Sequence, residues 1–345
     1  MRIRVLPSRK RKFINITLYL IAIAFTATNL ELVIGFNPAE PTTILQNQIV
    51  ALTANIEPDY VIPAIQENIE TLPYKPEEPP EGMLPVLAVD MHPNSGWGLW
   101  EASEGVFVRN STNLTVDVAS LFNQPLNLAP VRAGGPQVLI IHAHSSEAFM
   151  PTASHFYNPS DPMRTQDMNH TVMRVGLEMK QVLNDMGIET IQCRHVHDYP
   201  MYNGSYRRAL ECIERYLRQH PSIQVVIDVH RDSMQRPDGT RLKNVTNING
   251  EEVAQVMILS GTNASGLYHP NWRENLKLAM HWQSQMNADS PRLTRAIELR
   301  EERFNMHATK GSLLIEVGST GHTLEEAIRG GRLAAQALGR VLLRI

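Results

Sequence analysis

Four residues of types that bind metal ions or transfer protons stand at the ends of predicted buried strands or within them. They are His144 and Glu147 after VLII, His230 after IQVVIDV, and Glu316 within SLLIEV. A catalytic zinc ion takes three protein ligands, commonly histidines and a carboxylate, and leaves one position for water. A nearby carboxylate then transfers protons during hydrolysis. The sequence therefore indicates a zinc-dependent hydrolase.

We assign His144, His230 and Glu147 as the predicted ligands of Zn2+ and Glu316 as the general base and acid. The role of Glu316 follows from its place inside an apolar strand, because a buried carboxylate without a partner is costly. Glu147 is also compatible with a cap on a helix or turn. The third ligand is therefore open at this point.

Residues beside the predicted ligands are candidates for supporting the site. His142 shares a strand face with His144 if the strand continues, since side chains alternate with period 2. It is equally compatible with a ligand and with a packed, hydrogen-bonded residue. Arg231 and Asp232 are expected to pair with each other or to orient the histidine before them. His307 precedes the Glu316 strand by a short loop and is a candidate for entering the site.

A third group of polar and aromatic residues begins a predicted helix at HPNWRENL. Trp272 and Arg273 are candidates for lining a glycan groove, because aromatic faces stack on sugars. The equal alternative is an ordinary helix N-terminus with Asn271 as its cap.

The chain contains two cysteines, Cys193 and Cys212, whose spacing fits neither a zinc knuckle nor a redox motif. We interpret both as small buried hydrophobic residues. The sequence His195-Val196-His197 has the spacing of a metal-binding pair, but only Asp198 accompanies it as an acidic neighbour. We interpret this pair as structural.

Strand and helix signals alternate along the chain from residue 138. The predicted strands are 138–141, 189–195, 223–229, 255–261 and 312–317, after two β-like stretches at 105–110 and 113–118. The predicted helices are 172–186, 205–220, 271–287, 291–303 and 323–345. This alternation predicts an α/β fold with a mostly parallel twisted sheet and helices on both faces. Ligands of such sheets bind beyond the carboxyl ends of the strands.

The first third of the chain differs from this pattern. Residues 1–12 are basic, and the apolar stretch 13–36 is long enough to cross a bilayer. We predict a cytoplasmic tail and a single-pass membrane anchor, which places the remaining chain outside the cytoplasm; a cleaved signal peptide is the alternative. Residues 37–95 are rich in proline and are expected to form an extended linker. Residues 96–345 are then the catalytic domain.

The overall charge argues against a nucleic-acid partner. The chain of 345 residues has 32 lysines and arginines against 35 acidic residues, which gives a net charge of -3. No basic field for binding phosphates follows from this composition.

The segments HAHSSEAF, DVHRDS and HPNWRENL, and GSLLIEVGS followed by TLEEA, resemble the stage II sporulation protein P family. The resemblance covers roughly residues 130 to 345 in order and spacing. It implies a cell-wall hydrolase related to zinc-dependent N-acetylmuramoyl-L-alanine amidases. His144 and His230 match the family's histidine ligands, and Glu316 matches its catalytic glutamate. The glutamate ligand has no clear match, because its place holds Asn169 and His170, so Glu147 and His170 both stay open.

The resemblance also implies a biological setting. The substrate is peptidoglycan, cut at the amide between muramic acid and L-alanine, with cleavage of stem-peptide cross-links as a second activity. The setting is the sporulation septum and the engulfing membrane. The implied partners are a lytic transglycosylase and a polytopic membrane protein. Two alternatives stay open, namely a metal-free wall-binding scaffold and a zinc peptidase.

Overall fold

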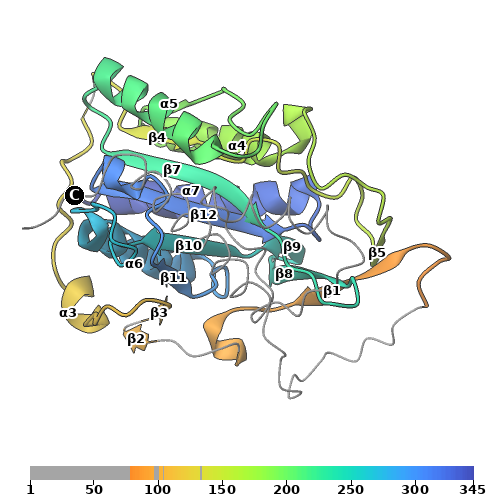
Figure 1. Ribbon diagram of the computed structural model, residues 1–345. Coiled ribbons are helices and arrows are strands. Elements are labelled where there is room, and N and C mark those ends of the chain that lie inside the picture. Colours follow the sequence, from red (N-terminus) through yellow and green to blue (C-terminus); the bar gives the residue numbers. More distant parts are fainter. Residues whose placement is uncertain (1–77, 97–100, 104, 133) are drawn as a thin grey trace, which may run out of the picture. The chain divides into compact units, whose positions relative to one another are not determined.

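The computed structural model describes residues 78–96, 101–103, 105–132 and 134–345 (Figure 1). The predicted tail 1–12, the predicted anchor 13–36 and most of the predicted linker 37–95 lie outside these residues. Within the described part, no helix combines the length and the apolar character needed to cross a bilayer. The single-pass anchor therefore stays a prediction.

A large sheet of eight strands forms the centre of the described fold. Its order is β2 (Glu101–Ser103), β3 (Val106–Asn110), β11 (Ile297–Arg300), β10 (Val256–Gly261), β12 (Gly311–Ser319), β7 (Val225–Asp232), β4 (Val138–Ile141) and β6 (Thr190–Gln192). The pairs β2–β3 and β10–β12 are antiparallel, and the other neighbours in this sheet are parallel. The prediction of a mostly parallel sheet is confirmed.

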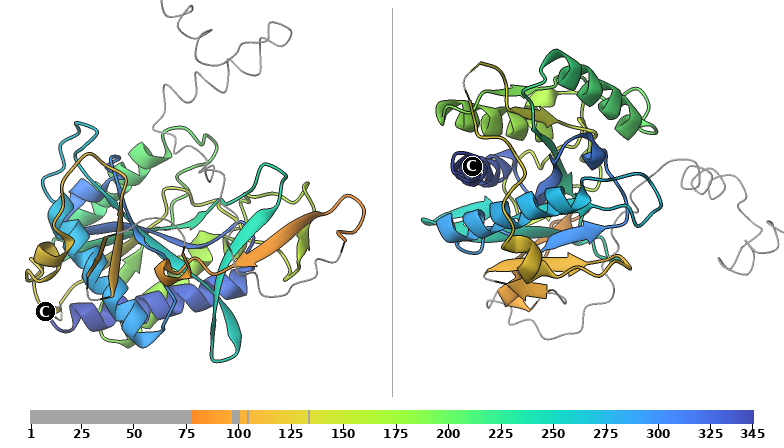
Figure 2. Two further views of the ribbon diagram at one scale, coloured as in Figure 1. Left: turned by 90° about the horizontal axis from the view of Figure 1, so that it is seen from below. Right: turned by 90° about the vertical axis from the view of Figure 1, so that its left-hand side faces the viewer.

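Helices cover both faces of this sheet, as the alternating pattern predicted (Figure 2). The main apolar core lies between one face and the helices α4 (Val172–Asp185), α6 (Trp272–Asp289) and α7 (Leu324–Leu342). A second core lies under α5 (Ser205–Gln219) on the other face, where Leu139, Ile141 and Val226 point. The remaining helices are α3 (Val118–Phe122) and the short 3-10 turns Pro93–Ser95, Met168–His170 and Met306–Ala308.

Capping signals explain where α4 and α7 begin and where α4 ends. The Thr171 hydroxyl accepts a hydrogen bond from Met173 N at the start of α4, and Gly187, with φ of 82°, follows its end. Thr323 and Glu326 form the predicted capping box of α7, in which each side chain accepts a hydrogen bond from the other's backbone. These local bonds satisfy backbone groups that the helices themselves leave without partners.

A smaller sheet lies beside the carboxyl ends of β7 and β12, at the right in Figure 1. Its order is β5 (Phe156–Tyr157), β1 (Leu84–Val89), β8 (Arg241–Ile248) and β9 (Glu251–Ala254). The predicted linker 37–95 is therefore wrong at its end, because β1 pairs in parallel with β8. Val86 and Val89 of β1 are buried in two small apolar clusters, which holds this strand in the fold.

Two further segment predictions are corrected. The predicted helix 291–303 contains the strand β11, in which Ile297 and Leu299 are fully buried with period 2. The β-like stretch 113–118 is not a strand; instead Asp117 caps α3 by accepting a hydrogen bond from Ser120 N. In both segments a short run of apolar residues is compatible with the periodicity of a helix and with that of a strand. Packing in the folded protein decides which one forms.

The buried His322 joins the end of β12 to the smaller sheet. Its Nδ1 accepts a hydrogen bond from Ser319 N at 2.9 Å, and its Nε2 donates to the carbonyl oxygen of Asn244 at 3.0 Å. These bonds require a neutral ring with the proton on Nε2. Burial, with the nearby Lys243 ammonium, lowers the pKa of His322 to about 3. The fold is therefore linked to the neutral form of this residue.

We predict that His322 makes the stability of the protein fall in mild acid. Its pKa in the folded protein lies below the unfolded value, so the unfolded chain takes up the proton first. The contribution of His322 is complete above pH 6.5 and is lost as the pH falls toward 3, at about 1.4 kcal/mol per pH unit. Urea unfolding of His322→Gln and the original chain at several pH values measures this. The gap in unfolding free energy should narrow in acid, and a constant gap contradicts the prediction.

Candidate functional site

Two of the predicted ligands, His144 and His230, meet at the carboxyl ends of β4 and β7. In this parallel pair Ile141 lies opposite Asp228, so the turn that follows β4 comes level with His230. The two rings are edge to face, with centroids 5.2 Å apart, and both side chains are buried. The rule that sites form beyond the ends of parallel strands is thus followed here.

Glu316 lies next to His230 on the neighbouring strand β12. The two residues are direct partners in the parallel register, so their side chains project to the same face of the sheet. Glu316 is buried, and its carboxylate is one of the groups that favour the charged form of His230. A break in the β7–β12 register follows between Glu316 and Ser319.

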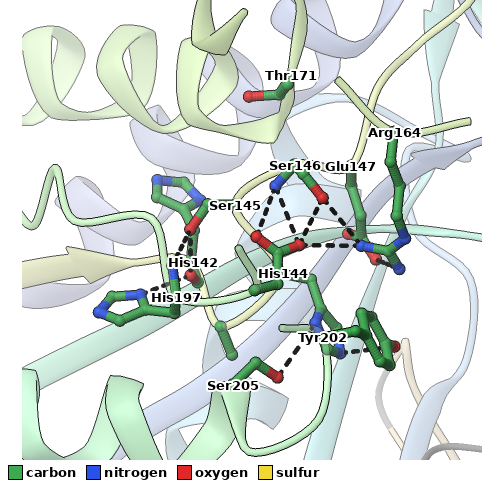
Figure 3. A network of polar contacts seen from close by, with 12 residues as sticks. His142, His144, Ser145, Ser146, Glu147, Arg164, Thr171, His197, Tyr202 and Ser205 are labelled. Atoms are coloured by element: carbon green, nitrogen blue, oxygen red, sulfur yellow. Dashed lines mark hydrogen bonds and ion pairs between the residues drawn. The ribbon is translucent and has the colours of Figure 1, made fainter. Parts of the chain in front are cut away.

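Glu147 reaches the same place from the turn after β4. Its Oε2 lies 3.6 Å from His230 Nδ1 and accepts a hydrogen bond from Arg231 N at 3.1 Å. Its Oε1 pairs with Arg164 at 3.4 Å, as Figure 3 shows. These contacts hold the carboxylate toward His230 and do not place it as the cap of a helix.

A further carboxylate, Asp228, stands on the other side of His230. Its Oδ1 lies 2.9 Å from His230 Nε2, without the angle of a hydrogen bond, and it accepts a hydrogen bond from Ala143 N at 2.9 Å. Burial disfavours the charged imidazole, but Asp228, Glu147 and Glu316 outweigh burial and raise the pKa of His230 to about 10. His230 therefore lies in a strongly negative environment that favours a bound cation.

The ring of His144 lies among hydroxyl and aromatic groups near the start of α5. Tyr202 stacks on it with centroids 4.5 Å apart, and the Tyr202 hydroxyl lies 3.0 Å from Nε2. Ser205 Oγ lies 3.4 Å from Nδ1 (Figure 3), and Tyr206 meets the ring edge on. Burial first, then the positive charges of His230 and Arg164, hold the pKa of His144 well below its usual range. The ring is therefore neutral and able to bind a metal.

His142 does not join this group. Its Nδ1 donates to the carbonyl oxygen of Val229 at 3.0 Å, and its Nε2 accepts from the Gln192 amide at 2.8 Å. A Cβ added at Gly176 of α4 would lie 2.5 Å from its ring. The strand face that His142 and His144 would share is not formed, because β4 ends at Ile141; His142 contacts α4, whereas His144 lies beside the start of α5. Burial lowers the pKa of His142 to about 4.

Arg231 and Asp232 do not pair side chain to side chain. The buried Arg231 guanidinium donates to the carbonyl oxygens of Ala148 and Met163, at 2.8 and 2.7 Å. Asp232 instead pairs with Arg295 at 2.7 Å. Arg231 therefore supports the site through its backbone N–H and by bracing the segment that carries Glu147.

The remaining candidates have other neighbours in the structure. Trp272 is buried in the main core, so its ring cannot stack on a sugar, and Asn271 precedes α6 without a side-chain cap bond. Arg273 lies over the Trp272 ring at 4.1 Å. His307 faces His269, with ring centroids 6.5 Å apart.

His170, the alternative third ligand, points to solvent with 67% of its side chain exposed. It lies 3.6 Å from Asp167 Oδ2. Of the two candidates for the third ligand, Glu147 is therefore the one that lies beside His230.

Several contacting residues were not predicted from the sequence. Tyr202, Tyr206 and Arg164 lie in loops or at a helix start, with no periodic signal to mark them. Arg164 pairs with Asp198 at 3.0 Å and stacks over the Tyr202 ring. Asp228 had a signal, because it is a carboxylate within the buried strand IQVVIDV.

The predicted ligands fit zinc by type, since His230 has Glu147 on one ring nitrogen and a supporting carboxylate on the other. They are not the most compact set, however. Among the described residues, one group of potential metal ligands has all its ligand atoms within 4.8 Å of one another. It consists of Cys193, His197 and Cys212. The geometry therefore offers two places for a metal ion, one beside His230 and one among Cys193, His197 and Cys212.

Comparison with solved structures finds bacterial amidases. The N-acetylmuramoyl-L-alanine amidase AmiC2 of Nostoc punctiforme is 13% identical, over 62% of this chain and 98% of that one, with a TM-score of 0.37. The N-acetylmuramyl-L-alanine amidase Ami1 of Mycobacterium smegmatis is 12% identical, over 63% and 99%, with a TM-score of 0.37. These similarities are weak, and the family assignment rests on the sequence.

A curated relative is the stage II sporulation protein P of Bacillus subtilis (strain 168). It is 26% identical over 215 residues, which are 59% of this chain and 50% of the relative. The chain thus matches about half the length of that protein. The model of the stage II sporulation protein P family matches residues 97–339, more than half of the chain. The chain belongs to the stage II sporulation protein P family.

Proposed function

We propose that this protein is a zinc-dependent peptidoglycan hydrolase that cleaves the amide between muramic acid and L-alanine during sporulation. The observation that carries the proposal is the meeting of His144, His230, Glu147 and Glu316 at the ends of three neighbouring strands. Membership of the sporulation family and the amidase activity in its structural relatives' names agree with this chemistry.

The proposed ligands are His144, His230 and Glu147. When bound there, zinc supplies Lewis-acid chemistry that activates water and polarises the substrate carbonyl. Asp228 keeps the imidazole of His230 oriented, and Arg231 N holds Glu147 in place. The buried surroundings strengthen each of these electrostatic contacts.

Glu316 is the proposed general base and acid. Its carboxylate accepts a proton from the attacking water and then gives it to the leaving amine, which allows the amide bond to break. Its strand position beside His230 is fixed by the β7–β12 register. Tyr202 and Arg164 form a polar wall on the side of His144 and are available to orient the substrate.

We further propose that residues 13–36 anchor the chain in the membrane, with the catalytic part outside the cytoplasm at the sporulation septum and engulfing membrane. The proposed partners are a lytic transglycosylase and a polytopic membrane protein. Cleavage of stem-peptide cross-links, as by a zinc peptidase, is an alternative that product analysis on purified muropeptides distinguishes.

Glu316→Gln is expected to lower the cleavage of purified sacculi by about 10²- to 10⁴-fold, because the amide cannot transfer the proton. Zinc content and thermal unfolding should stay unchanged. Glu298→Gln, which alters a buried glutamate on β11 outside the site, is the matched control and should keep full activity. Full activity in Glu316→Gln would refute its assigned role.

The third ligand is tested by comparing Glu147→Gln with His170→Ala. We expect the first variant to lose zinc and activity, because it removes the carboxylate beside Nδ1 of His230, and the exposed His170 to be dispensable. Zinc per chain, measured by plasma mass spectrometry, separates the two. The opposite pattern would assign His170 as the ligand.

Asp228→Asn keeps the oxygen that accepts from Ala143 N but removes the charge behind His230. We expect zinc affinity to fall by about 10- to 100-fold, as is typical when a carboxylate supporting a ligand is lost. Competition with a fluorescent chelator measures the affinity. An unchanged affinity would mean that Asp228 only braces the strand ends.

The same measurements test the metal-free alternative. A full chain that binds no zinc at this site and shows no chelator-sensitive lysis of sacculi would instead be a wall-binding scaffold.

A further inference from the structure

A second group of metal-binding side chains lies on the α5 side of the sheet. Cys193 follows β6, His197 comes from the next loop, and Cys212 projects from α5. Their ligand atoms all lie within 4.8 Å of one another, and all three residues are buried. This group could not be predicted from the sequence, because only the packing of α5 brings Cys212 close to Cys193.

The ring of His197 is oriented for metal binding. Its Nδ1 lies 2.9 Å from the carbonyl oxygen of His142, as Figure 3 shows, and a carbonyl can only accept. The proton is therefore on Nδ1, and Nε2 presents its lone pair toward the cysteines, 3.9 Å from Cys193 Sγ. Zinc-binding histidines typically donate their other ring nitrogen to a carbonyl or carboxylate in this way.

The thiol of Cys212 has a cationic neighbour. Cys212 Sγ accepts from the Arg215 guanidinium at 3.4 Å. Thiolates with imidazole form a soft donor set that selects zinc over hard cations such as magnesium or calcium.

We propose that Cys193, His197 and Cys212 bind a second zinc ion, separate from the one at His230. Zinc lies about 2.3 Å from thiolate sulfur and about 2.0 Å from imidazole nitrogen, so the three ligand atoms need to approach only slightly to share it. The neutral imidazole binds directly, and each protonated thiol releases its proton to solvent as its bond to zinc forms. Water completes the fourth position.

The proposed ion would support the segment that carries His144. Ser145 Oγ accepts from His197 N at 3.2 Å and donates to the His142 carbonyl oxygen at 2.9 Å. Asp198 accepts from Ser146 Oγ at 2.6 Å. The loop that supplies His197 is thus bonded to the turn after β4, and the ion would fix that loop to β6 and α5.

The test uses the purified full chain in reductant, loaded with Co2+ as the probe. Thiolate ligation gives an intense charge-transfer absorption in the near ultraviolet. We expect this band in the original chain and in His230→Ala, and its loss in Cys212→Ser and His197→Ala. His195→Ala changes the exposed neighbouring histidine and is the matched control that should keep the band.

Zinc content gives the second measurement. We expect two zinc ions per original chain and one each in His230→Ala and Cys212→Ser, with circular dichroism confirming that each variant is folded. No band in the original chain, or equal zinc content with and without Cys212, would overturn the proposal. So would a Cys193–Cys212 disulfide in chain purified without reductant, seen as the loss of two hydrogens by mass. Because the band does not depend on His230, failure of the proposed hydrolase leaves this result readable.

Discussion

The buried carboxylate of Asp228 links the two strand ends on which the candidate site depends. One of its oxygens accepts the backbone N–H of Ala143 after β4 and also faces the imidazole of His230 on β7. A buried charge is tolerated only when it is paired and hydrogen-bonded, so this contact constrains both strands at once. The turn after β4, which supplies His144 and Glu147, therefore has a fixed starting point relative to His230.

Around that contact the site is arranged by charge. Glu147, Asp228 and Glu316 surround one imidazole, while Arg164 and Arg231 stand behind the carboxylates. A neutral His144 and a cation-favouring His230 result from these different surroundings, although the two rings are in contact. Such opposed environments for like residues are typical of functional sites.

The sequence predicted the central strands, the helices on both faces and the meeting of His144, His230 and Glu316, because each depends on a local pattern of apolar residues. It did not predict the smaller sheet, although Asn249-Gly250, with positive φ at both residues, is a typical signal for the β8–β9 hairpin. It also failed where contacts join distant segments. Cys212 has no local feature that reveals Cys193, and Trp272 differs from an exposed aromatic residue only by its burial.

Gly176 has a consequence for how this protein can change. Glycine inside a helix costs about 1 kcal/mol relative to alanine, so α4 is less stable than it could be. That cost makes room for the imidazole of His142, which a methyl group at this position would meet at 2.5 Å. Position 176 is thus coupled to position 142. Alanine becomes acceptable in the helix only together with a smaller residue in place of the histidine, and that exchange would leave Val229 and Gln192 without their shared partner.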